Sequence, residues 1–267
     1  MPVTLPDLRP QVAEAIKTFW TGRLNAQQAQ ALTGRVDAGT RGAVTSGKHM
    51  DGFLSIALPL VERFAPYAAK HTRGNELRLP GYYRHNKKFD VIVMDGTKLV
   101  AVLEFKSMVG SFGNNANNRF EEVLGAAVDF WKAWDKGMLG TGMRPFLGWL
   151  MVLEDHEDSR RIVTDRSPHF SIAPDFLRTS YIDRFNRICE RMVQEKLYTA
   201  AAVISSKKGE ADHDGSYKED TAGTGIQRLF GDFASHLDEY TRNHHQPNLS
   251  FVLTNPPYTA ARRRRTQ

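Results

Sequence analysis

The 267-residue sequence contains a single cysteine, Cys189. One cysteine excludes a disulfide framework and a multi-cysteine zinc site within one chain, and helical spacing around it predicts a buried structural thiol. No apolar run approaches the ~20 residues that a membrane-spanning helix needs. The start, MPVTLPDLRP, lacks the basic region and apolar core of a secretory signal. We therefore expect a cytoplasmic protein with no membrane segment.

Acidic residues are the scarcer charged type, because 36 Lys and Arg face 30 Asp and Glu, for a net charge of +6. Four of those charges come from Arg262–Arg265, in a tail that is either a polyphosphate-binding arm or a solvated end. The charge is compatible with a nucleic-acid partner and does not establish one. From the length we expect a single domain over residues 1–267, with an N-terminal helical segment to about residue 47 and a basic tail from about residue 259.

The hydrophobic spacing predicts an α/β fold, with a mixed central sheet flanked by helices. The dipeptide Asp95-Gly96 is a strong hairpin signal, and the polar, glycine-rich residues 207–225 are expected to form a mobile loop. The expected helices cover residues 6–24 with a further piece to residue 32, then 51–65, 119–134, 181–197 and 226–240; the expected strands cover residues 89–94, 98–106, 145–153 and 199–205.

Three charged residues, Asp90, Glu104 and Lys106, interrupt the apolar hairpin FDVIVMDGTKLVAVLEFKS at residues 89–107. Side chains alternate along a strand, so Glu104 and Lys106 share one face. With the turn at Asp95-Gly96, Asp90 should lie opposite about residue 101, near the Glu104 end of the hairpin. The alternative is an exposed Glu-Lys pair on an edge strand with an unrelated aspartate.

Two carboxylates beside a lysine suit metal-assisted hydrolysis of a phosphodiester. Oxygen ligands are what Mg²⁺ prefers, and the metal can polarise the phosphoryl group and help to make hydroxide from water. The lysine can orient or deprotonate that water, or offset charge in the transition state. Glu62 or Glu76 could supply a further acidic ligand.

The spacing, an aspartate followed after thirteen residues by Glu-x-Lys, resembles the PD-(D/E)xK nuclease signature, although Phe89 stands where that signature has proline. The wider text resembles the XhoI-type type II restriction endonucleases over roughly residues 45–240. Four stretches carry the resemblance: GKHMDGF, LPGYYRHNKKFDVIV, LEFKSMVGSFGNNANNRFEEVLGAAVDFW and LGWLMVLED.

This resemblance implies a PD-(D/E)xK core in which Asp90 and Glu104 bind Mg²⁺ and Lys106 is the catalytic lysine. It also implies a homodimer that cuts a double-stranded DNA palindrome similar to CTCGAG and leaves a 5′ overhang. The alternative is a sequence-specific DNA-binding module on the same scaffold that does not cleave.

An asparagine-rich block precedes the helix expected from residue 119. Asparagine can read adenine bidentately and arginine can read guanine, so the candidate base-reading residues are Asn114, Asn115, Asn117, Asn118 and Arg119. The plainer alternative is a turn in which Asn118 caps the helix. Glu121 or Glu122 could instead approach the metal site from this helix.

Basic residues near the hairpin are candidates for phosphate contacts: Arg84, Lys87 and Lys88 before Asp90, and Lys48 and His49 after a glycine-rich loop. A solvated basic loop would look the same in sequence. Asp51 could line the cleft or simply begin a helix.

Two further motifs have alternative explanations. TNPPY at residues 254–258 resembles the Asn-Pro-Pro-Tyr motif of amino-methyltransferases, but no glycine-rich turn after a strand accompanies it, so a terminal proline turn is preferred. EDHED at residues 154–158 could bind a metal or form a solvated loop.

Overall fold

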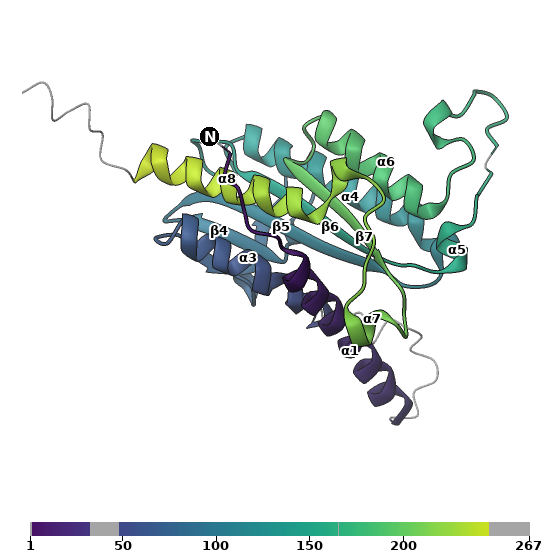
Figure 1. The fold of residues 1–267 in the computed structure, drawn as a ribbon. Helices are drawn as coiled ribbons and strands as arrows, with labels where there is room; N and C mark the ends of the chain where they lie inside the picture. Colours follow the sequence, from purple (N-terminus) through teal and green to yellow (C-terminus); the bar gives the residue numbers. More distant parts are fainter. Residues whose placement is uncertain (1, 33–47, 165, 246–267) are drawn as a thin grey trace, which may run out of the picture.

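The computed structural model describes residues 2–32, 48–164 and 166–245. Within this part of the chain, five strands form one mixed sheet in the order β1-β4-β5-β6-β7 (Figure 1). Strand β4 is antiparallel to both β1 and β5, whereas β5, β6 and β7 run parallel. The strands are β1 (Ala69–His71), β4 (Val91–Asp95), β5 (Lys98–Met108), β6 (Phe146–Glu154) and β7 (Ala200–Ser206). The predicted mixed α/β architecture is confirmed.

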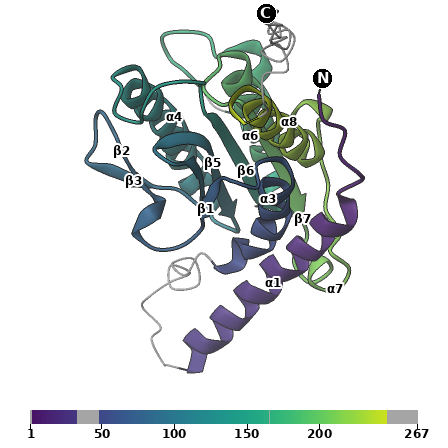
Figure 2. The ribbon, with the colours of Figure 1, turned by 90° about the vertical axis from the view of Figure 1, so that its left-hand side faces the viewer.

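Helices cover both faces of this sheet (Figure 2). The helices α1 (Arg9–Leu32), α3 (Asp51–Phe64) and α8 (Ile226–His244) share one hydrophobic core with it, and α4 (Phe112–Asp135) and α6 (Tyr181–Gln194) share the other. Gly52 lets α3 approach α1 closely, since a Cβ there would lie 2.7 Å from the Cα of Ala15. The shorter elements are η2 (Lys48–Met50), η3 (Asn75–Leu77), β2 (Arg78–Pro80), β3 (Asn86–Lys88), α5 (Glu157–Arg160), η4 (Pro174–Phe176), α7 (Ala211–Asp214) and η5 (Ala222–Thr224).

The β4–β5 hairpin has a different register from the predicted one. Asp95 pairs with Lys98, so the turn lies on Gly96 and Thr97 instead of on Asp95-Gly96. A bulge between Val93 and Met94 leaves Val100 on β5 without a counterpart, and its carbonyl accepts a hydrogen bond from Nε2 of His236 at 3.0 Å.

These two shifts move Asp90 relative to β5. Val91 pairs with Leu103, and the amide of Asp90 donates to the Leu103 carbonyl at 3.1 Å. The prediction that Asp90 lies opposite residue 101 is therefore wrong, and Asp90 lies at the level of Glu104.

Two expected boundaries are also wrong. Helix α4 begins at Phe112 instead of residue 119, so the asparagine-rich block is helical. The segment 207–225 is not a loop throughout, because α7 packs against α1 and buries Ala211 completely. In α3, Pro59 lies inside the helix without ending it.

Several sequence motifs fall outside the described residues, namely the glycine-rich loop up to residue 47, TNPPY at 254–258 and the tail Arg262–Arg265. Among the residues that the structure describes, no helix is both long enough and apolar enough to cross a bilayer. Cys189 is free and buried, as predicted.

Candidate active site

Glu104 lies at the centre of a charged cluster on β5. Its side chain is 1% exposed, and its Oε1 accepts from Nζ of Lys106 at 2.8 Å and from Nζ of Lys87 at 2.6 Å. The predicted common face of Glu104 and Lys106 is confirmed by this contact. Lys87, on β3, is 11% exposed, so it belongs to the cluster instead of to an open basic loop. Sequence spacing could not show this, because β3 belongs to a separate two-stranded ribbon with β2.

Asp90 joins the cluster from the residue before β4. Its Oδ2 accepts from the amide of Phe105 at 2.7 Å. Burial raises the pKa of Asp90 above its ordinary value, and the Glu104 carboxylate adds to that increase, whereas the Phe105 amide, Lys106 and Lys87 oppose it. The Glu104 carboxylate is therefore close enough to Asp90 to disfavour the charged form of that side chain.

Helix α4 adds Glu122 and Arg119 to the same cluster. Oε1 of Glu122 lies 3.4 Å from Nζ of Lys106, and its Oε2 accepts from Nη1 of Arg119 at 2.5 Å. Burial works to lower the pKa of Lys106, but Glu104 and Glu122 outweigh it and raise that pKa above its ordinary value. Burial likewise works to raise the pKa of Glu122, and Lys106 and Arg119 outweigh it and lower that pKa. Of the two glutamates considered, Glu122 approaches the cluster and Glu121 is exposed.

A pocket of ≈ 390 Å³ opens beside Asp90, and its wall includes Asp51, Arg73, Lys88 and Phe105. Asp51 is the first residue of α3. The hypothesis that Asp51 lines the cleft is therefore supported by its position. Lys88 is exposed at the same pocket, which leaves its ammonium accessible to an anion.

The cluster offers few protein ligands to a hard cation. Within the described residues, no group of three or more His, Cys, Asp and Glu side chains could hold a metal ion. Two carboxylates are nevertheless present, and Oε2 of Glu104 is buried without a hydrogen-bond partner. A buried carboxylate oxygen without a partner is costly, so Asp90 and Glu104 fit a divalent cation completed by water.

Glu62 and Glu76 do not contribute to this cluster. Glu62 forms an ion pair with Lys70, and Glu76 contacts Nδ1 of His71 at 3.0 Å. Both glutamates are mostly exposed. The suggestion that either is a further acidic ligand is not supported by their positions.

The asparagine block occupies the first turns of α4. Its four asparagines are exposed and Arg119 is half-buried: Asn114, Asn115, Asn117, Asn118 and Arg119. Asn118 is not the N-cap, because Ser111 holds that position with a φ of 48°. The asparagines are thus presented on a rigid helix beside Glu122.

Other predicted DNA-binding residues lie in different environments from those expected. Nε of Arg84 donates to Oδ2 of Asp129 at 2.7 Å, and its Nη2 donates to the Gly125 carbonyl at 3.0 Å. The ring of His49 is buried, and its Nε2 lies 3.2 Å from Oγ of Ser107. His49 therefore cannot present a surface cation to a phosphate, and Arg84 is engaged with α4. The side chain of Lys48 lies outside the described residues.

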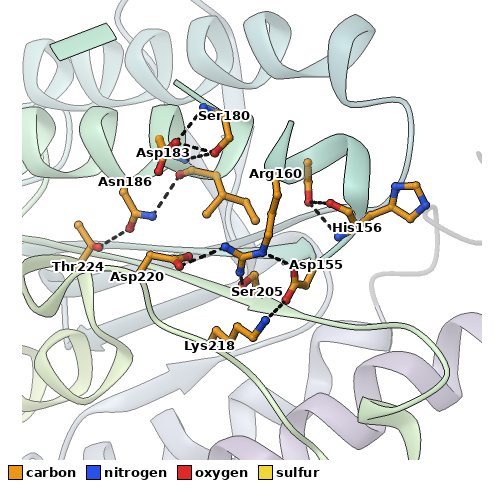
Figure 3. Close-up of polar contacts among 12 residues, drawn as sticks. Asp155, His156, Arg160, Ser180, Asp183, Asn186, Ser205, Lys218, Asp220 and Thr224 are labelled. Carbon is orange, nitrogen blue, oxygen red and sulfur yellow. Dashed lines mark hydrogen bonds and ion pairs between the residues drawn. The ribbon is translucent and has the colours of Figure 1, made fainter. Parts of the chain in front are cut away.

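A second polar network lies at the ends of β6 and β7 (Figure 3). Asp155 is nearly buried and pairs with Arg160 and with Lys218, whose Nζ lies 2.8 Å from its Oδ2. His156 accepts from the amide of Asp158 at 3.1 Å and caps α5. The EDHED motif therefore ends β6 and begins α5 instead of forming a loop throughout, and its Asp155 links Arg160 of α5 to Lys218.

Comparison with known proteins gives consistent matches. The family model "Restriction endonuclease XhoI" matches residues 29–219. A type II restriction enzyme XhoI from Xanthomonas vasicola is 45% identical over 181 residues, which is 67% of this chain and 72% of that protein. The type II restriction enzyme AbrI from Azospirillum brasilense is 42% identical over 172 residues, 64% of this chain and 77% of that protein.

The type II restriction enzyme BstVI from Geobacillus stearothermophilus is 41% identical over 189 residues, which is 68% of this chain and 84% of that protein. No solved structure matches significantly. The model match covers the β4–β5 hairpin, the charged cluster and the asparagine-rich start of α4. The chain therefore belongs to the XhoI restriction endonuclease family.

Proposed function

We propose that the protein is a homodimeric, Mg²⁺-dependent type II restriction endonuclease. It cleaves both strands of a DNA palindrome similar to CTCGAG and leaves 5′ overhangs. The observation that carries this proposal is the environment of Glu104. Its buried carboxylate keeps one oxygen without a partner, next to Asp90 and in contact with Lys106.

Asp90 and Glu104 would hold the cation in this proposal. When bound, Mg²⁺ supplies Lewis-acid polarisation of the phosphoryl oxygen and a lower pKa for bound water. In the free protein Lys87 and Lys106 neutralise Glu104, which reduces the cost of keeping that carboxylate charged and buried.

Lys106 acts as a cation in this proposal. Its raised pKa keeps the ammonium protonated at neutral pH, so the side chain can offset charge on the transition state and orient water, but is a poor proton acceptor. Glu122 contacts the same ammonium from α4, with Nζ 3.4 Å from its Oε1. Together, Glu104 and Glu122 fix where this charge lies.

The DNA would lie along the exposed start of α4 and across the pocket at Asp90. The four asparagines there offer both donors and acceptors to base edges. Lys88 is the exposed cation closest in sequence to Asp90 and is assigned to a backbone phosphate.

The direct test is cleavage of a supercoiled plasmid with Mg²⁺, repeated with a chelator, followed by sequencing of the ends. Discrete fragments that disappear with the chelator are expected, and the end sequences give both the target and the overhang. Smearing would indicate a non-specific nuclease. A retained mobility shift without any cutting would indicate the alternative, a binding module.

The variant Glu104→Gln keeps the shape of the side chain and removes its charge. Cleavage should fall by about 100-fold or more, and the rise in melting temperature that Mg²⁺ or Ca²⁺ gives the wild type should disappear. Glu76→Gln is the matched control, because Glu76 is exposed and lies outside the cluster. Wild-type cleavage by Glu104→Gln would remove this residue from the mechanism.

A further inference from the structure

Helix α4 presents an apolar stripe on the side that faces away from the sheet. Leu124 is 36% exposed and Val128, one turn later, is 48% exposed. At Gly125 a Cβ would meet no atom within 4 Å, so another backbone could approach closely there. We call Leu124, Gly125 and Val128 the α4 stripe.

Two exposed aromatic residues lie beside the α4 stripe. Tyr82 is 44% exposed and Tyr83 is 66% exposed, and the amide of Tyr83 donates to Oδ1 of Asp129 at 2.7 Å. The loop that carries them is therefore fixed to α4, at the edge of the molecule where β2 and β3 also lie (Figure 2). Single exposed apolar residues are common, but here four large ones lie on α4 and on a loop held against α4, and groups of this kind mark interaction surfaces.

We propose that the α4 stripe packs against the α4 stripe of a second copy of this chain, with the two helices antiparallel. This inference rests on the proposed function, because a palindromic target calls for two-fold symmetry in the protein. The charges that flank the stripe support self-association. Glu121 precedes it and Lys132 follows it, and both lie on the same side of the helix at about 100° per residue.

An antiparallel pair centred between residues 126 and 127 places Glu121 opposite the partner's Lys132, and the reverse contact forms by symmetry. Within the described residues Glu121 forms no ion pair, and Lys132 lies over the ring of Tyr82 at 5.7 Å. In one antiparallel register, each end of the stripe is therefore complementary in charge to the opposite end of the stripe in a second copy.

This arrangement also puts two active sites on one side of the dimer. Glu122 and Asn118 lie about a quarter of a turn around the helix from the stripe. A two-fold axis perpendicular to two antiparallel helices leaves these flanks facing the same way, toward one DNA duplex. The two Glu122 residues would be about 14 Å apart along the helices and about 9 Å apart across them, a separation of about 17 Å that corresponds to about five base pairs.

Charge reversal tests both the surface and its register. Glu121→Lys and Lys132→Glu should each weaken self-association by about tenfold, as measured by sedimentation without DNA or metal. An equimolar mixture of the two variants should restore wild-type affinity. In a mixed dimer, position 121 of each chain faces position 132 of the other, and both contacts then join a lysine to a glutamate. A mixture that associates no more tightly than the single variants overturns the proposal.

Cross-linking gives an independent readout. Val128→Cys should form a covalent dimer with a short bis-maleimide, whereas Ile162→Cys should not. Ile162 is a matched control at 50% exposed, and the native Cys189 is buried. Equal cross-linking of the two variants, or none in either, overturns the proposal.

These measurements separate the interface from the chemistry. A dimer with the expected charge pattern but no cleavage would contradict the proposed function and leave the interface intact. Cleavage by a protein that stays monomeric at tens of micromolar, or that dimerises without sensitivity to these changes, would overturn the interface and leave the nuclease intact.

Discussion

His49 is a histidine whose surroundings suppress its charge. His49 is 5% exposed, and the centroid of its ring lies 5.5 Å from the centroid of the Phe19 ring. Burial, together with the nearby Arg23, lowers the pKa of His49 from 6.5 to about 4. Nδ1 is buried without a partner, so the neutral ring fits this site and the imidazolium does not.

His49 should therefore make stability depend on pH. The pKa of His49 is about 4 in the folded protein and 6.5 in the unfolded chain. The stabilisation that comes from keeping the ring neutral is therefore fully present above pH 6.5, and it is lost as the pH falls toward about 4. Between about pH 7 and 4.5 the wild type should lose about 2 kcal/mol more of its free energy of unfolding than His49→Gln. Urea denaturation across that range measures the difference.

His213→Gln is the matched control, because the side chain of His213 is 83% exposed. Its unfolding free energy should follow the wild-type pH dependence. If His49→Gln follows the wild type as well, the buried ring carries a proton at low pH without penalty, and the assignment of its environment is wrong.

At the candidate site, the sequence predicted which charged side chains of one strand share a face. It did not predict which side chains from other elements contact them. Alternation along β5 correctly placed Glu104 and Lys106 together, because period 2 is a local property. Lys87 and Lys88 are adjacent in sequence, yet one is nearly buried against Glu104 and the other is exposed. That division depends on how the β2–β3 ribbon docks against the sheet, which no local pattern encodes.

At the level of elements, the start of helix α4 at Phe112 instead of residue 119 has a physical explanation. Asparagine favours turns and caps in isolation, so the block before Arg119 indicated a loop. Phe112 and Ala116 are buried against the sheet, and their packing extends the helix through the asparagines. Strands β4 to β7, the helices on the faces of the sheet and the hairpin were predictable from periodicity, whereas the short edge strand β1 was not. The bulge was not predictable either, and the Val100 carbonyl that it leaves unpaired accepts a hydrogen bond from His236 of α8.

The loop that carries Tyr82 and Tyr83 depends on one buried carboxylate of α4. Asp129 is 4% exposed and accepts from the amide of Tyr83 and from Nε of Arg84, each at 2.7 Å. Asp129→Ala removes both acceptors, and Arg84, which is 38% exposed, can turn to water. We expect a loss of about 1–3 kcal/mol in the free energy of unfolding, measured by urea denaturation.

Loss of this contact should reduce cleavage more than stability alone explains, because the same segment continues into Lys87 and Lys88. Asp135→Ala, on the same helix but exposed, should change stability by less than about 0.5 kcal/mol. Equal destabilisation by both variants would indicate a general effect on α4 instead of loss of the Asp129 contacts.

At the level of the whole molecule, each chain carries one cluster of Asp90, Glu104 and Lys106. A single proposed site can cut one strand at a time, so cutting both strands within one binding event calls for two copies. The fold supports this arrangement, since α4 brings Glu122 within 3.4 Å of Nζ of Lys106 and exposes Leu124 and Val128 on the side that faces away from the sheet.

Mixed dimers test that requirement. Co-expression of wild-type chains with differently tagged Asp90→Ala chains, followed by purification on both tags, gives dimers with one intact site. These dimers should convert supercoiled plasmid to nicked circles, because only the strand that faces the intact site is cut. Wild-type dimers should give linear DNA, and Asp90→Ala dimers should give neither product. Linear DNA from mixed dimers at the wild-type rate would mean that one site cuts both strands. The offset between the two cuts would then arise from successive binding of a single site and not from the two-fold symmetry of a dimer.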